Sequence, residues 1–193
     1  NNEKLKNGDM LLIDAGAEVE SYASDITRTF PVNGKFSRNQ KIVYEIVLAA
    51  QLAAIAEVKP GNRWNQPHDA AVAVITEGLL DMGILKGSLQ KLIQTEACRP
   101  YYMHKTGHWL GMDVHDVGDY KIADQWRVFE PGMVTTIEPG LYFSAFTKGL
   151  PKKWHNIGIR IEDDVLVTSS GCDVLSDAPK TVKEIEDLMR AVH

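Results

Sequence analysis

Residues 8–16 read GDMLLIDAG, and residues 132–140 read GMVTTIEPG. Both stretches begin and end with glycine, contain a short apolar run, and place isoleucine, an acid and glycine at the same offsets. Short apolar runs bounded by glycine are typical of β-strands. The repeat therefore predicts two related strands, one ending at Asp14 and the other at Glu138.

A second acid follows each copy of the repeat, Asp25 after the first and Glu162 after the second. In an antiparallel hairpin, two residues lie opposite each other when the turn is centred midway between them. The midpoints of the pairs Asp14–Asp25 and Glu138–Glu162 fall between Val19 and Glu20 and at Leu150. Both midpoints lie in turn-like sequence, so each acid pair is expected to face across a hairpin, with Cβ atoms about 5 Å apart.

Four carboxylates that converge in this way repel one another and, inside a core, also lose their hydration. The arrangement is therefore costly unless cations bring about four positive charges. The alternative is that these acids are ordinary exposed strand residues, as most acids are. The matching positions of Asp14 and Glu138, each after an apolar run and before glycine, favour a metal site.

Three of the six histidines, His104, His108 and His115, lie within twelve residues. Glycines at positions 107 and 111 argue against a helix there, and an extended segment 104–108 would place His104 and His108 on one face. His115 is expected in a later strand, beside Val114 and Val117. Carboxylates with one neutral imidazole suit Mn, Fe, Co or Zn better than Ca or Mg. The other three histidines, which we assign structural roles, are His68, His155 and His193.

The rest of the chain predicts strands, then helices, then strands, then one helix, which is an α+β fold in a single domain. The predicted helices begin at capping residues and end at glycine or proline. They cover residues 38–58 with a Ser37–Gln40 capping box, Asn65 to Gly83, Ser88 to about Thr95, and a last helix from the Thr181–Glu184 capping box. The sequence from His104 into the 160s has the pattern of β-strands.

Composition and charge argue against several kinds of partner and indicate the compartment. The 193 residues carry 21 Lys+Arg and 26 Asp+Glu, a net charge of −5, without a basic cluster, which argues against nucleic acid or an anionic membrane as partner. No apolar run approaches the roughly 20 residues that span a bilayer. Only Cys98 and Cys172 are present, which predicts a reducing, cytoplasmic location. The opening Asn1-Asn2-Glu3, without Met, predicts a piece of a longer protein.

These residues together resemble the pita-bread metallopeptidases, most closely their aminopeptidase P (Xaa-Pro aminopeptidase) branch. The motifs that carry the resemblance are Asp25–Phe30, His108–Asp116, Ile137–Tyr142 and Gly158–Asp163. The resemblance implies a pita-bread fold whose pseudo-twofold halves correspond to the repeat. It also implies that residues 1–193 are the C-terminal major part of a catalytic domain, truncated at the N-terminal side and lacking one substrate-contacting histidine.

The resemblance further implies a centre of two divalent ions, expected to be Mn2+. Asp25 and Glu162 would bridge the ions, Asp14 would complete the shell of one ion, and His108 and Glu138 that of the other. Glu138 would take a proton from the attacking water. His104 and His115 would contact the substrate carbonyl. Apart from the resemblance, Arg160 lies two residues before Glu162, hence on the same strand face, and is expected to hold an acidic ligand; the alternative is a surface salt bridge.

The activity implied is release of the N-terminal residue from peptides with proline in second position, by a chain that could form homo-oligomers. Three alternatives stay open: an Xaa-Pro dipeptidase (prolidase), a non-catalytic peptide-binding module, and a metal-independent hydrolase of the creatinase kind. The isolated chain is expected to be much less active than a longer parent, because part of the pocket wall would be missing.

Overall fold

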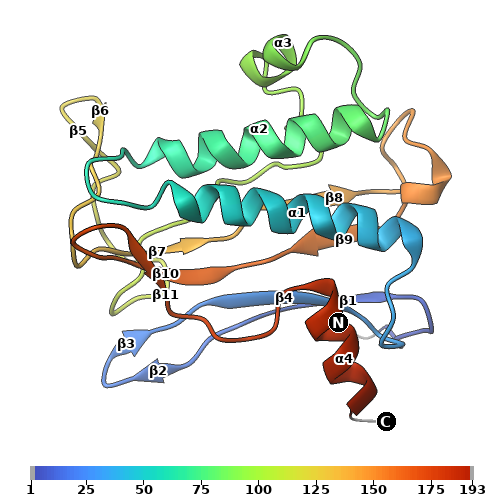
Figure 1. Ribbon diagram of the computed structural model, residues 1–193, viewed down its shortest axis with the longest axis horizontal. Helices are drawn as coiled ribbons and strands as arrows, with labels where there is room; N and C mark the ends of the chain where they lie inside the picture. Colours follow the sequence, from blue (N-terminus) through green and yellow to red (C-terminus); the bar gives the residue numbers. More distant parts are fainter. Residues whose placement is uncertain (1–2, 192–193) are drawn as a thin grey trace.

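The computed structural model describes residues 3–191 (Figure 1). It confirms the α+β order of elements. The helices are α1 (Arg38–Ala56), α2 (Asn65–Asp81), α3 (Leu89–Gln94) and α4 (Val182–Ala191), with a short 3-10 helix at Lys152–Trp154. The strands are β1 (Met10–Ala15), β2 (Glu18–Val19), β3 (Tyr22–Ala23), β4 (Ile26–Pro31), β5 (Lys121–Ile122), β6 (Gln125–Trp126), β7 (Val134–Ile137), β8 (Gly140–Phe143), β9 (Ile157–Arg160), β10 (Asp163–Val167) and β11 (Cys172–Val174). Among the described helices, none is both long and apolar enough to cross a membrane.

The first acid-bearing hairpin differs in register from the prediction. Asp14 pairs with Thr27, not with Asp25. The reason lies in the turn of the β2–β3 hairpin, where Glu20 and Ser21 take φ values of 51° and 64° and form a tight two-residue connection one residue later than predicted. The resulting slip is two residues. Because side chains alternate with period two, an even slip leaves Asp14 and Asp25 on the same face of the hairpin.

The second hairpin has the predicted register. Gly140 pairs with Arg160 in β8–β9, and Ile137 pairs with Asp163 in β7–β10, so that Glu138 and Glu162 lie opposite each other between the two ladders. The connection is longer than a tight turn at Leu150, because it contains the 3-10 helix.

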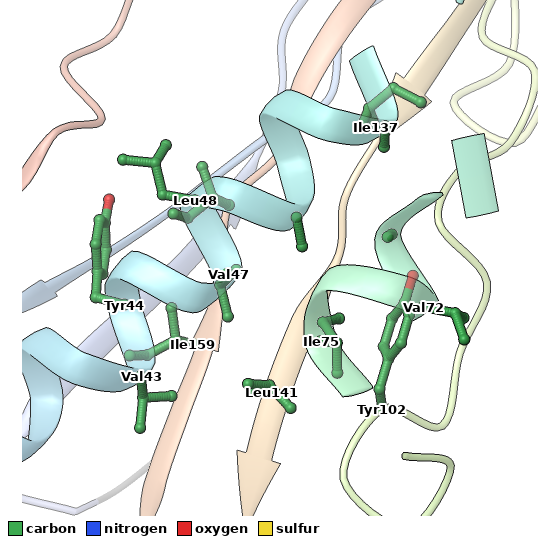
Figure 2. Close-up of a cluster of buried hydrophobic side chains, with 14 of the residues drawn as sticks. Val43, Tyr44, Val47, Leu48, Val72, Ile75, Tyr102, Ile137, Leu141 and Ile159 are labelled. Atoms are coloured by element: carbon green, nitrogen blue, oxygen red, sulfur yellow. The ribbon is translucent and has the colours of Figure 1, made fainter. Parts of the chain in front are cut away.

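Helices α1 and α2 lie side by side along β8 and β9 (Figure 1). Their facing side chains form the core with the strands, as Figure 2 shows for Val47 of α1, Ile75 of α2, Leu141 of β8 and Ile159 of β9. Burial of such side chains contributes about 1.5–3 kcal/mol each. This core holds strands β8 and β9 of the second hairpin against the two helices.

The helix boundaries follow the predictions closely, with two corrections. The capping boxes at Ser37–Gln40 and Thr181–Glu184 both form. Asn65 is the first residue of α2 and does not cap it, because its side-chain amide donates to Asp69 within the helix. Ser88 stands before α3 without a side-chain cap bond.

Residues 106–110 run antiparallel to β7, because Trp109 bridges Thr135 and the Leu110 N–H donates to the Val134 carbonyl, so the β-like prediction holds there. It is wrong for residues 111–120, where no strand forms. Local bonds hold the chain after Leu110, since the Asp116 N–H donates to the Trp109 carbonyl and the Gly111 N–H to that of Asp113. His115 accordingly lies in a loop and not in a strand.

The two halves of the fold meet along a line that we call the seam, where β4 lies against β9 and β10. One backbone bridge crosses it, between Thr27 and Glu162, with the Glu162 N–H donating to the Thr27 carbonyl at 3.0 Å. Two residues away, the Thr29 hydroxyl makes the contacts that a backbone N–H and carbonyl would make in a ladder. It donates to the Arg160 carbonyl at 2.8 Å and accepts from the Arg160 N–H at 3.1 Å. The acids of both hairpins are gathered at this seam.

Candidate metal centre

The five residues predicted as metal ligands come together at the seam. Their side-chain donor atoms form overlapping groups in which all atoms lie within 4.8 Å of one another: His108, Glu138 and Glu162 in one, Asp14, Asp25 and Glu162 in another. We call these five residues the donor set. Asp25, His108 and Glu162 are buried, whereas Asp14 is exposed and Glu138 is intermediate.

The His108 ring is oriented by its neighbours in a way that suits a metal ligand. Its backbone is held by Thr136, whose N–H donates to the His108 carbonyl at 3.0 Å. The ring Nδ1 lies 3.0 Å from the Trp109 carbonyl, which only accepts, so Nδ1 carries the proton. Nε2 of the neutral ring is then free to coordinate, and it faces Asp25 Oδ2 at 3.4 Å and Glu138 Oε1 at 3.8 Å.

The carboxyl groups of the donor set are short of positive charge. Burial, together with the neighbouring carboxyl groups, raises the pKa of Glu162 to about 8 and that of Glu138 to about 7. Burial and Asp14 also raise the pKa of Asp25. Arg160 is the arginine that approaches the cluster; it pairs with Asp14 and stands 4.0 Å from Glu138 Oε2. Four carboxylates and one free imidazole nitrogen are a donor set that fits divalent transition ions.

Two residues that the sequence analysis missed support the donor set. The Thr27 hydroxyl donates to Glu162 Oε2 at 2.5 Å and accepts from Arg160 Nε at 3.1 Å. The Tyr142 hydroxyl lies 3.5 Å from Arg160 Nη1. Thr27 stands two residues after Asp25, hence on the same strand face, and this spacing was a signal that could have identified it.

The two other predicted site histidines, His115 and His104, differ in how close they lie to the donor set. His115 is exposed, and its ring centroid lies 4.0 Å from that of His108, so that it forms a third close group with His108 and Asp25. His104 is outside these groups, because its Nε2 lies 2.8 Å from the Tyr142 hydroxyl and its Nδ1 2.7 Å from the Lys105 carbonyl.

The remaining histidines are held by structural contacts where they are described. His68 Nδ1 lies 2.7 Å from the Thr106 hydroxyl, and His155 Nε2 lies 3.0 Å from the Leu150 carbonyl. His193 lies outside the described residues.

The segment that carries His108 approaches β7 so closely that only glycine fits at position 107. A Cβ there would lie 2.0 Å from the Thr136 carbonyl oxygen, which is backbone and cannot move aside cheaply. We expect Gly107→Ala to lower both the melting temperature and the affinity for Mn2+, because it pushes His108 away from β7. The matched control is Gly171→Ala, where a Cβ meets nothing within 4 Å. Equal Mn2+ titrations for Gly107→Ala and the unmodified chain would contradict this prediction.

A groove of about 580 Å³ opens beside the donor set. Asp14, Asp25 and His115 line it together with the apolar residues Met112 and Val114. A groove lined by both carboxylates and apolar side chains can accept a peptide whose charged end reaches the acids.

The α+β fold with its internal repeat, and the five donor-type side chains gathered at the seam, are what the pita-bread metallopeptidase class would present. Residues 1–169 match the model of metallopeptidase family M24, and the chain belongs to this family. The description of the family as metallopeptidases implies the use of a divalent metal ion.

Individual relatives are similar over nearly the whole chain. The chain is 51% identical over 190 residues to an Xaa-Pro aminopeptidase of Haemophilus influenzae, covering 98% of this chain and 44% of the relative. It is 39% identical to an Xaa-Pro dipeptidase of Homo sapiens, with coverage of 98% and 44%. The solved structure of Pseudomonas aeruginosa aminopeptidase PepP superimposes with a TM-score of 0.97 at 56% identity, covering 99% of this chain and 43% of that one. The chain thus spans less than half the length of these relatives.

Proposed function

We propose that the donor set holds two divalent ions, with Mn2+ as the metal used, and that residues 1–193 contribute this centre to the catalytic domain of an aminopeptidase. The observation that carries the proposal is the convergence of four acids from the two hairpins and His108 from the segment before β7 in overlapping close groups. Glu162 belongs to two of the overlapping groups, which supports a bridging role. Two ions with four positive charges would balance the four carboxylates.

The proposed substrate is a peptide with proline in second position, from which the N-terminal residue is released. This substrate class is supported by the names of the relatives with which the chain shares 51% and 46% of its residues, both Xaa-Pro aminopeptidases. When bound, divalent ions lower the pKa of water and polarise the scissile carbonyl. The chain's own residues would accept the proton and hydrogen-bond the carbonyl oxygen, and the groove offers the space for the peptide.

Three side chains have distinct proposed tasks. Glu138, whose carboxylate faces His108 Nε2 at 3.8 Å, would accept the proton released during the attack on the carbonyl. His115, an exposed residue that lines the groove, would donate a hydrogen bond to the carbonyl oxygen as negative charge develops there. His104 would act together with it after exchanging its contact with Tyr142 for one with the substrate.

An Xaa-Pro dipeptidase is the second candidate, because a human enzyme of that name is 39% identical to the chain. The two enzymes differ in whether peptides longer than two residues are cleaved. A non-catalytic peptide-binding module is less well supported, because peptide binding alone does not require buried carboxylates gathered at such cost. We place the protein in the cytoplasm, in line with its two free thiols.

Metal binding is the first test of the proposal. Calorimetric titration with Mn2+ should give about two ions per chain, and the binding should be abolished by a chelator. Peptide cleavage should then be measured with Ala-Pro-Ala, Ala-Pro and Met-Ala-Ala, using the chain and any longer polypeptide that contains it. Cleavage of Ala-Pro-Ala after its first residue supports the aminopeptidase. Cleavage of Ala-Pro alone supports the dipeptidase, and an active preparation free of metal would refute the metal-dependent reaction.

A further inference from the structure

The seam follows one register over three positions, and the third position lies at the metal centre. Thr29 stands opposite Arg160, and Thr27 stands opposite Glu162. A further step of two residues brings Asp25, which stands just before β4, to Asp164 of β10. Because side chains alternate along a strand, Glu162 and Asp164 share the face toward the donor set, whereas Asp163 points to the other face.

At this third position a side chain replaces the backbone acceptor. The Asp25 N–H donates to Asp164 Oδ2 at 3.1 Å, in a buried contact between residues 139 positions apart. The other oxygen, Oδ1, is buried and has no hydrogen-bond partner among the described residues. A carboxylate that is 5% exposed and has one of its oxygens unpaired is expensive, so its presence is not explained by packing.

The Asp164 backbone is held firmly, so the carboxylate is presented from a fixed position. Asp164 pairs with Thr136 in the β7–β10 ladder. On its other side, the Asp164 N–H donates to the Ser176 hydroxyl at 2.9 Å, and its carbonyl accepts from the Leu175 N–H at 2.8 Å. Asp25, by contrast, stands outside the strands, between β3 and β4.

We infer that Asp164 is a positioning residue: by accepting the Asp25 N–H across the seam, it fixes the Asp25 carboxylate at the spacing from His108 and Glu162 that a divalent ion requires. Asp164 is not itself in any close group with the donor set. It acts through Asp25, as an outer partner that orients a ligand. The inference rests on the proposed function, since it assigns Asp25 to the metal centre.

The test compares Asp164→Ala, which removes the acceptor, with Asp164→Asn, which keeps an oxygen acceptor in the same place. Asp173→Asn on the neighbouring strand β11 makes the same charge change at an exposed site and serves as the matched control. The first readout, in the metal-free chain, is hydrogen exchange of the Asp25 amide by NMR. Exchange should accelerate in Asp164→Ala and stay slow in Asp164→Asn and in the control.

The second readout is the Kd for Mn2+ by calorimetry. Loss of an outer partner typically weakens metal binding about 10- to 100-fold, and we expect this for Asp164→Ala, with Asp164→Asn close to the unmodified chain. The inference is overturned if Asp164→Ala keeps slow exchange and full affinity, or if Asp164→Asn fails as badly as Asp164→Ala. An unmodified chain that binds no Mn2+ would refute the proposed function, and this inference with it. The exchange data would still report on the hydrogen bond itself.

Discussion

His108→Ala and His115→Ala are expected to fail in different ways. His108 presents Nε2 to Asp25 and Glu138, so its loss should remove a coordinating atom from the proposed centre. Metal content and peptidase activity should therefore fall together. His115 is exposed at the groove and is proposed to contact substrate. Its loss should leave both ions bound while kcat falls about 100-fold, the scale expected for losing a positioned hydrogen-bond donor.

The measurements are metal stoichiometry, melting temperature and kcat on both variants side by side. His155→Ala is a suitable control, because His155 contacts the Leu150 carbonyl away from the donor set and its loss should leave metal and kcat unchanged. The close approach of the His108 and His115 rings makes the comparison informative. A His115 variant that has lost its metal, or one with unchanged kcat, would show that the roles are wrongly assigned.

Among the substitutions proposed here, Asp163→Ala is expected to lower the free energy of unfolding the most. Asp163 is fully buried on the face of β10 opposite to the donor set, and it accepts from Arg28 Nη2 at 2.7 Å, Lys180 Nζ at 2.5 Å and Gln51 Nε2 at 2.7 Å. Removing it leaves two cations in a poorly hydrated place without their partner. Breaking a buried ion pair from one side costs about 3–5 kcal/mol, and we expect the free energy of unfolding to fall by about this amount.

Chemical denaturation with the metal-free chain checks this prediction. Asp187→Ala removes an acid that pairs with Lys183 and Arg190 on the exposed side of α4 and should change the unfolding midpoint little. If Asp163→Ala does not fold, Lys180→Gln offers a milder version, because Asp163 then keeps Arg28 and Gln51. An unfolding midpoint of Lys180→Gln or Asp163→Ala equal to that of the unmodified chain would contradict the prediction.

Local signals made the helices and the second hairpin predictable. The capping boxes at Ser37 and Thr181 act within one turn of chain, so their energetics are present in the sequence itself. The register of Glu138 against Glu162 also followed from counting residues. The register of the first hairpin differs from the predicted one by two residues. Glu20 and Ser21 adopt left-handed conformations, which these residue types rarely take and which the sequence therefore did not indicate.

The sequence by itself determined the donor types, their places at strand ends and the face that each pair shares, because strand alternation and turn position are short-range properties. Only the tertiary structure decided that the two hairpins meet at one seam. It alone also revealed Tyr142 and Asp164 as partners of the donor set, through contacts such as the one that joins Asp25 to a residue 139 positions away. Such long-range pairings depend on how the two hairpins meet where β4 lies against β9 and β10. They are settled by the free energy of the whole fold and not by any local pattern.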